Sequence, residues 1–157
     1  MPIRNSLAMV HTAPRQLLAQ EVAIPEIGHE EALLRIEACG ICGSDYEQFE
    51  GVLRSPMPAI PGHEPLGLIE RIGDGAAARW GVDVGDRVAV ETMLACRNCR
   101  NCLAGNYHIC PNRRIYSYIP LGDANGLWGA YAESMYLHPN RLVHKIDPIL
   151  TPELSVL

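Results

Sequence analysis

The sequence has 157 residues, a formal net charge of −5 and a hydrophobic content of 48%. This length accommodates one domain with its own core, and the acidic balance argues against nucleic acid as a general partner. No apolar run approaches the ~20 residues that cross a bilayer, and the first residues lack the long apolar segment of a secretory signal. We therefore expect a cytoplasmic protein with no membrane partner.

Short apolar or alternating runs recur along the chain, separated by breakers such as Ile60-Pro61-Gly62, and predict strands. The runs cover residues 16–24, 31–38, 66–72, 87–90, 131–137 and 141–146. The expected fold class is mainly β, with a closed or partly closed barrel as its architecture.

Two short helices are predicted. The first follows Cys42, where Ser44 and Asp45 would cap residues that continue toward Phe49. The second begins at Thr151-Pro152-Glu153, which combines a capping hydroxyl, an early proline and an early acid. Only four residues follow Glu153, fewer than a stable isolated helix needs, so the ending favours a fragment, with a frayed natural terminus as the alternative.

Residues 91–118 interrupt the strand pattern because Cys, Asn and Arg predominate over apolar side chains. A zinc ion in a closed structural site takes four thiolates, leaves no position for substrate and supplies folding free energy to such a loop. A reducing cytoplasm also favours metal over disulfides. The candidate ligands form C-x2-C-x2-C-x7-C and are Cys96, Cys99, Cys102 and Cys110.

Two alternatives remain for these cysteines. They could be unligated thiols, although a polar loop offers no packing reason for four of them. An iron–sulfur cluster is the sharper competitor, because Cys110-Pro111 ends the bacterial cluster signature, whose last spacing is shorter than the spacing here.

Four arginines flank the cysteines, and no acid occurs between Cys96 and Arg114. Four thiolates around one divalent zinc carry a net double negative charge, which these arginines would offset. The same arginines leave open a zinc-finger-like nucleic-acid binder, whose affinity would depend steeply on salt. The four are Arg97, Arg100, Arg113 and Arg114.

A second set of candidate ligands lies in residues 40–45, Gly-Ile-Cys-Gly-Ser-Asp, and residues 62–64, Gly-His-Glu. About twenty residues separate the two, enough for one strand or loop to return and bring Cys42 beside His63. Catalytic zinc uses three protein ligands and one open position, so Glu64 is either a third ligand or an outer partner. Cys39 forms C-x2-C with Cys42, but no βαβ pattern supports a redox pair there.

The motifs GICGSD, PGHE, GDRV and the four-cysteine run, in this order, resemble the N-terminal domain of zinc-dependent medium-chain alcohol dehydrogenases. The resemblance spans essentially the whole chain and implies a GroES-like, partly open β-barrel with short helices. It implies that Cys42 and His63 bind a catalytic zinc ion with Glu64 beside it, and that the four later cysteines bind a structural zinc ion. It also implies a small alcohol, polyol or sugar substrate and, at full length, a homo-oligomer.

By the same resemblance, Ser44 takes the place of the hydroxyl that contacts the substrate alcohol and passes its proton outward, and Asp45 braces the zinc site. Many relatives carry a histidine a few residues further on, whereas this chain reads Tyr46-Glu47-Gln48. Glu47 or water would then complete the proton route, and the alternative for Glu47 is a solvated surface acid.

No strand-flanked G-x-G-x-x-G occurs in the sequence. We therefore expect the nucleotide-binding domain for NAD or NADP, and the family's third zinc ligand, to lie outside residues 1–157, which form one catalytic domain without redox turnover of its own. The alternative is a non-catalytic, zinc-stabilised binding module. Such a module needs only the closed cysteine site, so the presence of Cys42 and His63 favours the enzyme.

Overall fold

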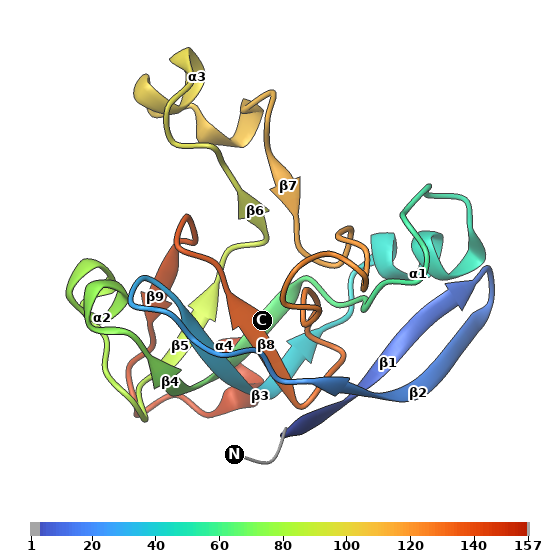
Figure 1. The fold of residues 1–157 in the computed structure, drawn as a ribbon, viewed down its shortest axis with the longest axis horizontal. Coiled ribbons are helices and arrows are strands. Elements are labelled where there is room, and N and C mark those ends of the chain that lie inside the picture. Colours follow the sequence, from blue (N-terminus) through green and yellow to red (C-terminus); the bar gives the residue numbers. More distant parts are fainter. Residues whose placement is uncertain (1–3, 157) are drawn as a thin grey trace.

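A five-stranded antiparallel sheet, a long hairpin and a projecting lobe make up the computed structural model, which describes residues 4–156 (Figure 1). The hairpin pairs β1 (Asn5–Ala13) with β2 (Gln16–Ala23) and contacts the remainder through isolated bridges at Ala8 and His11. The sheet has the order β8-β3-β4-β5-β9 and contains β3 (Ala32–Gly40), β4 (Glu64–Ile72), β5 (Arg87–Val90), β8 (Ser134–Leu137) and β9 (Val143–Lys145).

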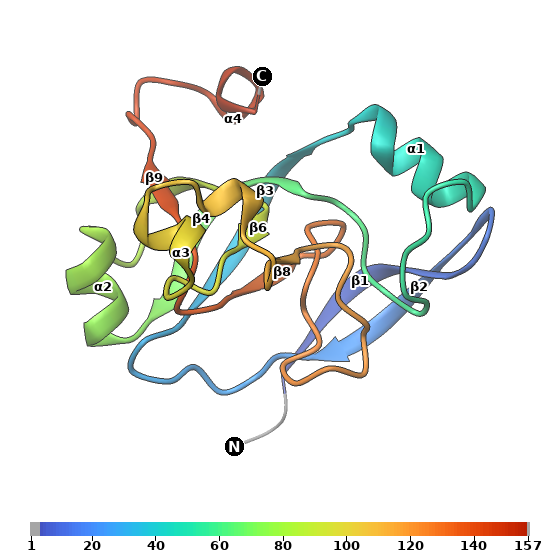
Figure 2. The same cartoon turned by 90° about the horizontal axis from the view of Figure 1, so that it is seen from above.

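The helices are short and occupy the connections. Figure 2 shows α1 (Gly43–Glu50) and α2 (Asp74–Trp80) at opposite ends of the molecule. No helix within the described range has the length and apolar character that spanning a bilayer requires. The projecting lobe contains β6 (Met93–Leu94), α3 (Arg100–Leu103), the 3₁₀ turn η1 (Tyr107–Ile109) and β7 (Arg114–Ile115), and α4 (Pro152–Ser155) lies near the end of the chain.

Most of the predicted elements are confirmed, with small differences in their bounds. The strands expected at residues 16–24, 31–38, 66–72, 87–90 and 141–146 correspond to β2, β3, β4, β5 and β9. The run at 131–137 becomes a strand only from Ser134. The helices expected after Cys42 and Thr151 are α1 and α4, and Leu157 lies outside the described residues.

Outside the lobe, β1 and α2 have no counterpart among the predicted strands and helices, for physical reasons. In β1 the inward residues Ser6, Ala8 and Val10 are buried, yet the outward Leu7 and Met9 are apolar too, so hydrophobicity does not alternate. Gly73 is the N-cap of α2, which has only seven residues and therefore offers too short a run to predict a helix from its periodicity.

A buried aromatic cluster attaches the base of the lobe to the sheet. The Trp128 ring lies 5.5 Å from Tyr116 and 5.0 Å from Tyr136, both edge to face. The Tyr116 hydroxyl donates to the Tyr136 carbonyl at 2.8 Å and accepts from the His138 N–H at 3.0 Å. The chain that leaves the lobe is thereby held against β8.

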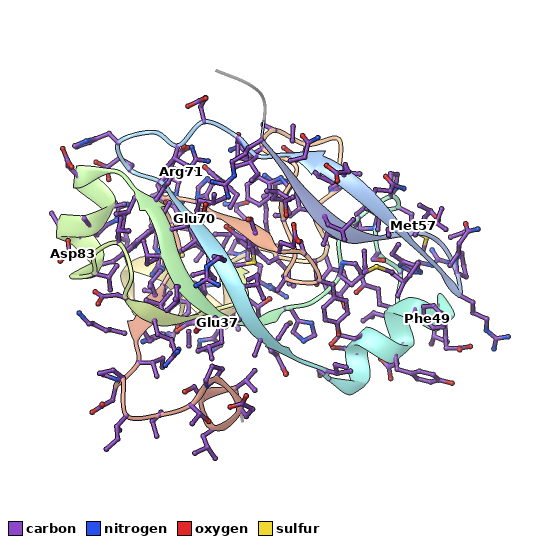
Figure 3. The ribbon with its side chains drawn as sticks, turned by 90° about the horizontal axis from the view of Figure 1, so that it is seen from below. Glu37, Phe49, Met57, Glu70, Arg71 and Asp83 are labelled. Atoms are coloured by element: carbon purple, nitrogen blue, oxygen red, sulfur yellow. The ribbon has the colours of Figure 1, made fainter. Side chains whose placement is uncertain are left out.

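A second connection runs across the sheet. Glu37 lies on β3 (Figure 3), and its Oε2 is 2.6 Å from Nε of Arg87 on β5. Arg87 Nη1 also donates to the Leu150 carbonyl at 3.1 Å. This paired arginine joins β3, β5 and the segment that precedes α4.

The segment before β8 lies directly against residues 60–62, which lead into β4. The Ala130 N–H donates to the Gly62 carbonyl and the Tyr131 N–H donates to the Pro61 carbonyl, both at 3.0 Å. This close approach depends on Gly129, because a Cβ there would lie 1.9 Å from the Ile60 carbonyl oxygen. Backbone, not a flexible side chain, occupies that space.

Gly129→Ala is therefore expected to lower the free energy of unfolding by about 1–3 kcal/mol, the range for inserting volume into a packed interior. Gly122→Ala is the matched control, because a Cβ at Gly122 meets nothing within 4 Å. Equilibrium urea unfolding of the zinc-loaded protein compares the two variants. Equal stabilities would show that the backbone contact at Gly129 does not constrain the fold.

Candidate metal centres

The pairing of β3 with β4 determines where the first set of candidate ligands lies. Gly40, the last residue of β3, is opposite Glu64, the first residue of β4. Cys42 follows β3 and His63 precedes β4, so the antiparallel pairing places both at the same end of the sheet. One ligand atom from each of Cys42, His63 and Glu64 lies within 4.8 Å of the others.

Cys42 also begins the helix α1. Its backbone is extended, with φ −96° and ψ 159°, and its N–H donates to Asp45 Oδ2 at 2.9 Å. The predicted cap at Ser44 or Asp45 is wrong, because Cys42 is the N-cap and Asp45 is the third helical residue, which closes a capping box with it. This box determines where the Cys42 thiol lies relative to the helix.

Asp45 orients His63 as well. Asp45 Oδ1 lies 3.2 Å from His63 Nδ1, and the two side chains are 5% and 14% exposed. The hydrogen bond to Asp45 raises the pKa of His63 to about 9. Burial opposes ionisation of Asp45, but hydrogen bonds from His63 and from the Cys42 backbone lower its pKa. A carboxylate on Nδ1 leaves Nε2 as the ring nitrogen of His63 that is available to bind a metal ion.

Ser44 lies between the thiol and the imidazole. Its Oγ is 3.3 Å from Cys42 Sγ and 3.4 Å from His63 Nε2. The hydrogen bond from the Ser44 hydroxyl, followed by one from the Ser44 backbone, lowers the pKa of Cys42. A lowered pKa favours the thiolate, which is the form that binds metal. A hydroxyl at this position can also take up or release a proton next to a bound ion.

The donor set fits an open zinc site. One thiolate, one imidazole and one carboxylate are ligand types that zinc accepts, and three ligands leave a fourth position for substrate. The Glu64 carboxylate is exposed and folds back over Gly40, where a Cβ would lie 2.1 Å from Oε2. This geometry is compatible with Glu64 as the third ligand or as a neighbour of the ion.

The four thiols of the lobe fit a closed site for a single ion. The Sγ–Sγ distances are 3.5 Å for Cys99–Cys102 and Cys96–Cys110, 3.8 Å for Cys99–Cys110 and 4.0 Å for Cys96–Cys102. Four sulfurs at ~2.3 Å from one tetrahedral zinc lie about 3.8 Å apart. A disulfide needs a separation of ~2.05 Å, and an iron–sulfur cluster distributes its cysteines over several irons. Among the metals considered, zinc matches this spacing.

The lobe arginines do not all neutralise the thiolates. Arg97 Nη2 donates to the Asn140 carbonyl at 3.0 Å, and Arg114 forms an ion pair with Asp123. The prediction that all four arginines offset the charge of the thiolates is therefore wrong for Arg114, because Asp123 already neutralises its guanidinium. Backbone N–H groups contribute instead, and that of Asn98 lowers the pKa of Cys96.

Comparison with known proteins identifies the family of this chain. Residues 28–148 match the family described as the alcohol dehydrogenase GroES-like domain. The chain belongs to this family. The membership confirms the family predicted from the motifs, and with it the mainly β, GroES-like fold.

Individual members of the GroES-like family support the assignment. A probable alcohol dehydrogenase of Mycobacterium tuberculosis is 45% identical over 153 residues, which are 96% of this chain and 42% of that protein. An erythritol/L-threitol dehydrogenase of Mycolicibacterium smegmatis is 38% identical over 151 residues, 90% of this chain and 40% of that protein.

A solved structure from Sinorhizobium meliloti 1021, described as a zinc-binding dehydrogenase bound to NADP, superimposes with a TM-score of 0.79 at 26% identity. The superposition covers 95% of this chain and 40% of the Sinorhizobium chain. The chain therefore spans about two fifths of the length of the GroES-like relatives it matches.

Two tyrosines beside the Asp45–His63 pair had no signal in the sequence. Burial, followed by the charge of Asp45, raises the pKa of both Tyr118 and Tyr131. Tyr131 also packs on the chain next to His63, since a Cβ at Gly62 would lie 2.6 Å from Tyr131 Cδ1. Both residues are distant from α1 in sequence, and only the fold brings them close. The ligand and proton-transfer roles themselves stay predictions.

Asp45→Asn is expected to weaken zinc binding at Cys42 and His63 by about 10–100-fold, the usual cost of removing a partner of a ligating histidine. Asparagine keeps the shape and can still accept from the Cys42 N–H, but it removes the charge next to His63. Competition with a chromophoric chelator measures this affinity, with Glu47→Gln, an exposed acid on the same helix, as the control. Unchanged affinity in Asp45→Asn would rule out this role.

Proposed function

We propose that residues 1–157 are the zinc-binding catalytic domain of an alcohol or polyol dehydrogenase that transfers a hydride to NAD or NADP. The observation that carries the proposal is the placement of Cys42, His63, Ser44 and Asp45 together at one end of the sheet. A zinc-stabilised binding module would need only the four-cysteine lobe. The second, open set of candidate ligands at Cys42 and His63 therefore favours an enzyme.

In this proposal Cys42 and His63 hold the catalytic zinc, and Glu64 is the third ligand or its neighbour. Bound zinc would supply a Lewis acid that lowers the pKa of a substrate hydroxyl. Asp45 holds Nδ1 of His63, so that Nε2 is presented to the ion. Ser44 Oγ lies 3.3 Å from Cys42 Sγ and 3.4 Å from His63 Nε2, and it accepts the proton of the alcohol as its own hydroxyl proton passes outward.

The onward route of that proton is open to solvent. Glu47 lies three residues after Ser44 on α1, so the two share a helix face, and its side chain is exposed. Glu47 therefore relays the proton in this proposal, with direct transfer to water as the alternative.

The remaining parts of the proposal concern the longer protein. Cys96, Cys99, Cys102 and Cys110 hold a structural zinc that orders the lobe. In this proposal the nicotinamide cofactor binds outside these 157 residues, which span about two fifths of the length of the relatives, one of whose structures is bound to NADP. We propose an alcohol, polyol or sugar substrate, a homo-oligomer, a cytoplasmic location and no nucleic-acid partner.

The test is steady-state NAD or NADP reduction by the full-length protein with a panel of simple alcohols, polyols and sugars. Zinc-dependent turnover is expected, whereas the 157-residue chain alone is expected to show none. Full-length protein that binds two zinc ions but oxidises none of the panel would favour a binding module. Steady turnover by the isolated chain would contradict the proposed division into domains.

A further inference from the structure

The route by which a proton leaves Ser44 is the least complete part of the Cys42–His63 site. Ser44 Oγ contacts Cys42 Sγ at 3.3 Å and His63 Nε2 at 3.4 Å, and in the described part of the chain it forms no hydrogen bond with Glu47. Glu47 is exposed and lies three residues further along α1. A group between Ser44 and Glu47 would complete the route to solvent.

The chain that leaves the lobe passes beside α1. Gln48 of α1 is fully buried, and its Nε2 donates to the Ser117 carbonyl at 3.0 Å. Figure 1 shows this part of the chain, which follows β7, descending from the lobe toward α1. Gln48 lies four residues after Ser44, so the two side chains share a face of the helix. The bond therefore holds Ser117 against the face of α1 that carries Ser44.

The next residues of the same chain lie beside the approach to His63. The Leu121 N–H donates to the Pro58 carbonyl at 2.8 Å, and Pro120 forms an isolated antiparallel bridge with Ala59. Tyr118 lies between these contacts and the one that Ser117 makes with α1. The backbone is thus attached on both sides of Tyr118, to the helix and to the segment that leads into β4.

The side chain of Tyr118 lies over the first turn of α1. It is partly buried, and burial raises its pKa. The charges of Asp45, Cys42 and Glu47, in that order, raise this pKa further. A hydrogen bond with the Ser44 side chain lowers the pKa of Tyr118. All four groups belong to residues 42–47, so the Tyr118 hydroxyl lies close to Ser44 and within the field of Glu47.

A tyrosine hydroxyl has the chemistry that a relay between these two groups requires. The ordinary pKa of tyrosine is about 10, and that of Tyr118 is raised, so the side chain keeps its proton at neutral pH. A phenolic hydroxyl both donates and accepts. It can therefore accept a proton while it gives up its own, without becoming a phenolate.

We propose that Tyr118 is a proton-relay residue between Ser44 and Glu47, an inference that rests on the proposed dehydrogenase function. As Ser44 accepts the proton of the alcohol, its own hydroxyl proton passes to Tyr118 Oη. The proton of Tyr118 passes in turn to the Glu47 carboxylate, which releases it to water. Each hydroxyl oxygen gains one O–H bond as it loses another, so only a proton leaves the site by this route.

The test compares the full-length, zinc-loaded protein with Tyr118→Phe, which removes only the hydroxyl. The kcat of alcohol oxidation is expected to fall by about 10–100-fold with little change in KM, because water replaces the relay only in part. The matched control is Tyr46→Phe, an exposed tyrosine of α1, which should turn over as the parent does. Both variants should keep the zinc content of the parent. Loss of zinc in Tyr118→Phe would assign Tyr118 to the structure of the metal centres and overturn the relay.

Glu47→Gln tests the next step of the route. It is expected to slow turnover as well, and the double variant with Tyr118→Phe should be no slower than the slower single variant, since both changes interrupt one route. Losses that multiply in the double variant would overturn a shared route. Glu47→Gln decides the question if Tyr118→Phe does not fold.

The contact between Ser44 and Tyr118 can be measured without turnover. In carbon NMR spectra of the full-length protein labelled at tyrosine Cζ, Ser44→Ala is expected to shift the Tyr118 signal and to leave that of Tyr46 in place. The signal absent from Tyr118→Phe identifies Tyr118. A Tyr118 signal that does not respond, or parent-like kcat in Tyr118→Phe, would overturn the relay alone. A parent protein that oxidises no alcohol would contradict the dehydrogenase function on which the relay rests.

Discussion

Replacing Cys110 with serine is expected to release one zinc ion and to unfold the lobe between β6 and β7. Cys110 is fully buried and its Sγ lies 3.5 Å from that of Cys96 and 3.8 Å from that of Cys99. Structural zinc contributes about 10–16 kcal/mol of apparent binding free energy in zinc-finger peptides, so an incomplete shell removes most of what orders such a loop. Serine is similar in size to cysteine but does not supply the thiolate.

The five-stranded sheet should survive this change, because its core lies outside the lobe. Hydrogen exchange is therefore expected to rise in residues 93–115 and to stay low in β3 and β4, while the zinc content falls by one equivalent. Cys39→Ser is the matched control, since Cys39 belongs to neither ligand group. If Cys110→Ser retains its full zinc content, or if Cys39→Ser loses as much zinc, the four-cysteine site is wrongly assigned.

Most of the sheet was predictable because its strands combine alternation with clear breakers. β5 runs from Arg87 to Val90, as the pattern predicts. β1 was not predictable, since Leu7 and Met9 are apolar on its exposed face. The order in which the strands pair could not be predicted from the sequence either, because it depends on contacts between segments far apart in the chain.

The two candidate metal centres differ in how much of each could be predicted from the sequence. The spacing of the lobe cysteines alone predicts a four-ligand site, because all four lie in one loop. Cys42 and His63 meet only through the β3–β4 pairing, which the motif order suggests but local sequence does not determine. The place of Tyr131 near Asp45 could not be predicted, since it depends on contacts between distant segments and no metal-site motif contains Tyr131.

Replacing Cys42 with serine is expected to abolish dehydrogenase turnover of the full-length protein while leaving the fold intact. Serine is among the preferred N-cap residues, so α1 keeps its first residue and Asp45 can still accept from the backbone N–H at position 42. The thiolate is lost, however. An outer partner of a zinc ligand is worth about 10–100-fold in affinity or activity, so loss of the ligand itself should exceed about 100-fold.

The number of zinc ions that each variant retains per chain then distinguishes the two centres. Cys42→Ser is expected to lose only the ion of its own site, since His63 and Glu64 remain there without a thiolate, and to keep the ion in the lobe. Cys110→Ser should show the reverse pattern, with a disordered lobe and a retained Cys42–His63 pair. Atomic absorption after dialysis against a mild chelator, together with thermal unfolding, distinguishes these cases. Loss of all zinc in Cys42→Ser would mean that the two sites are not independent, and undiminished turnover would remove Cys42 from the catalytic site.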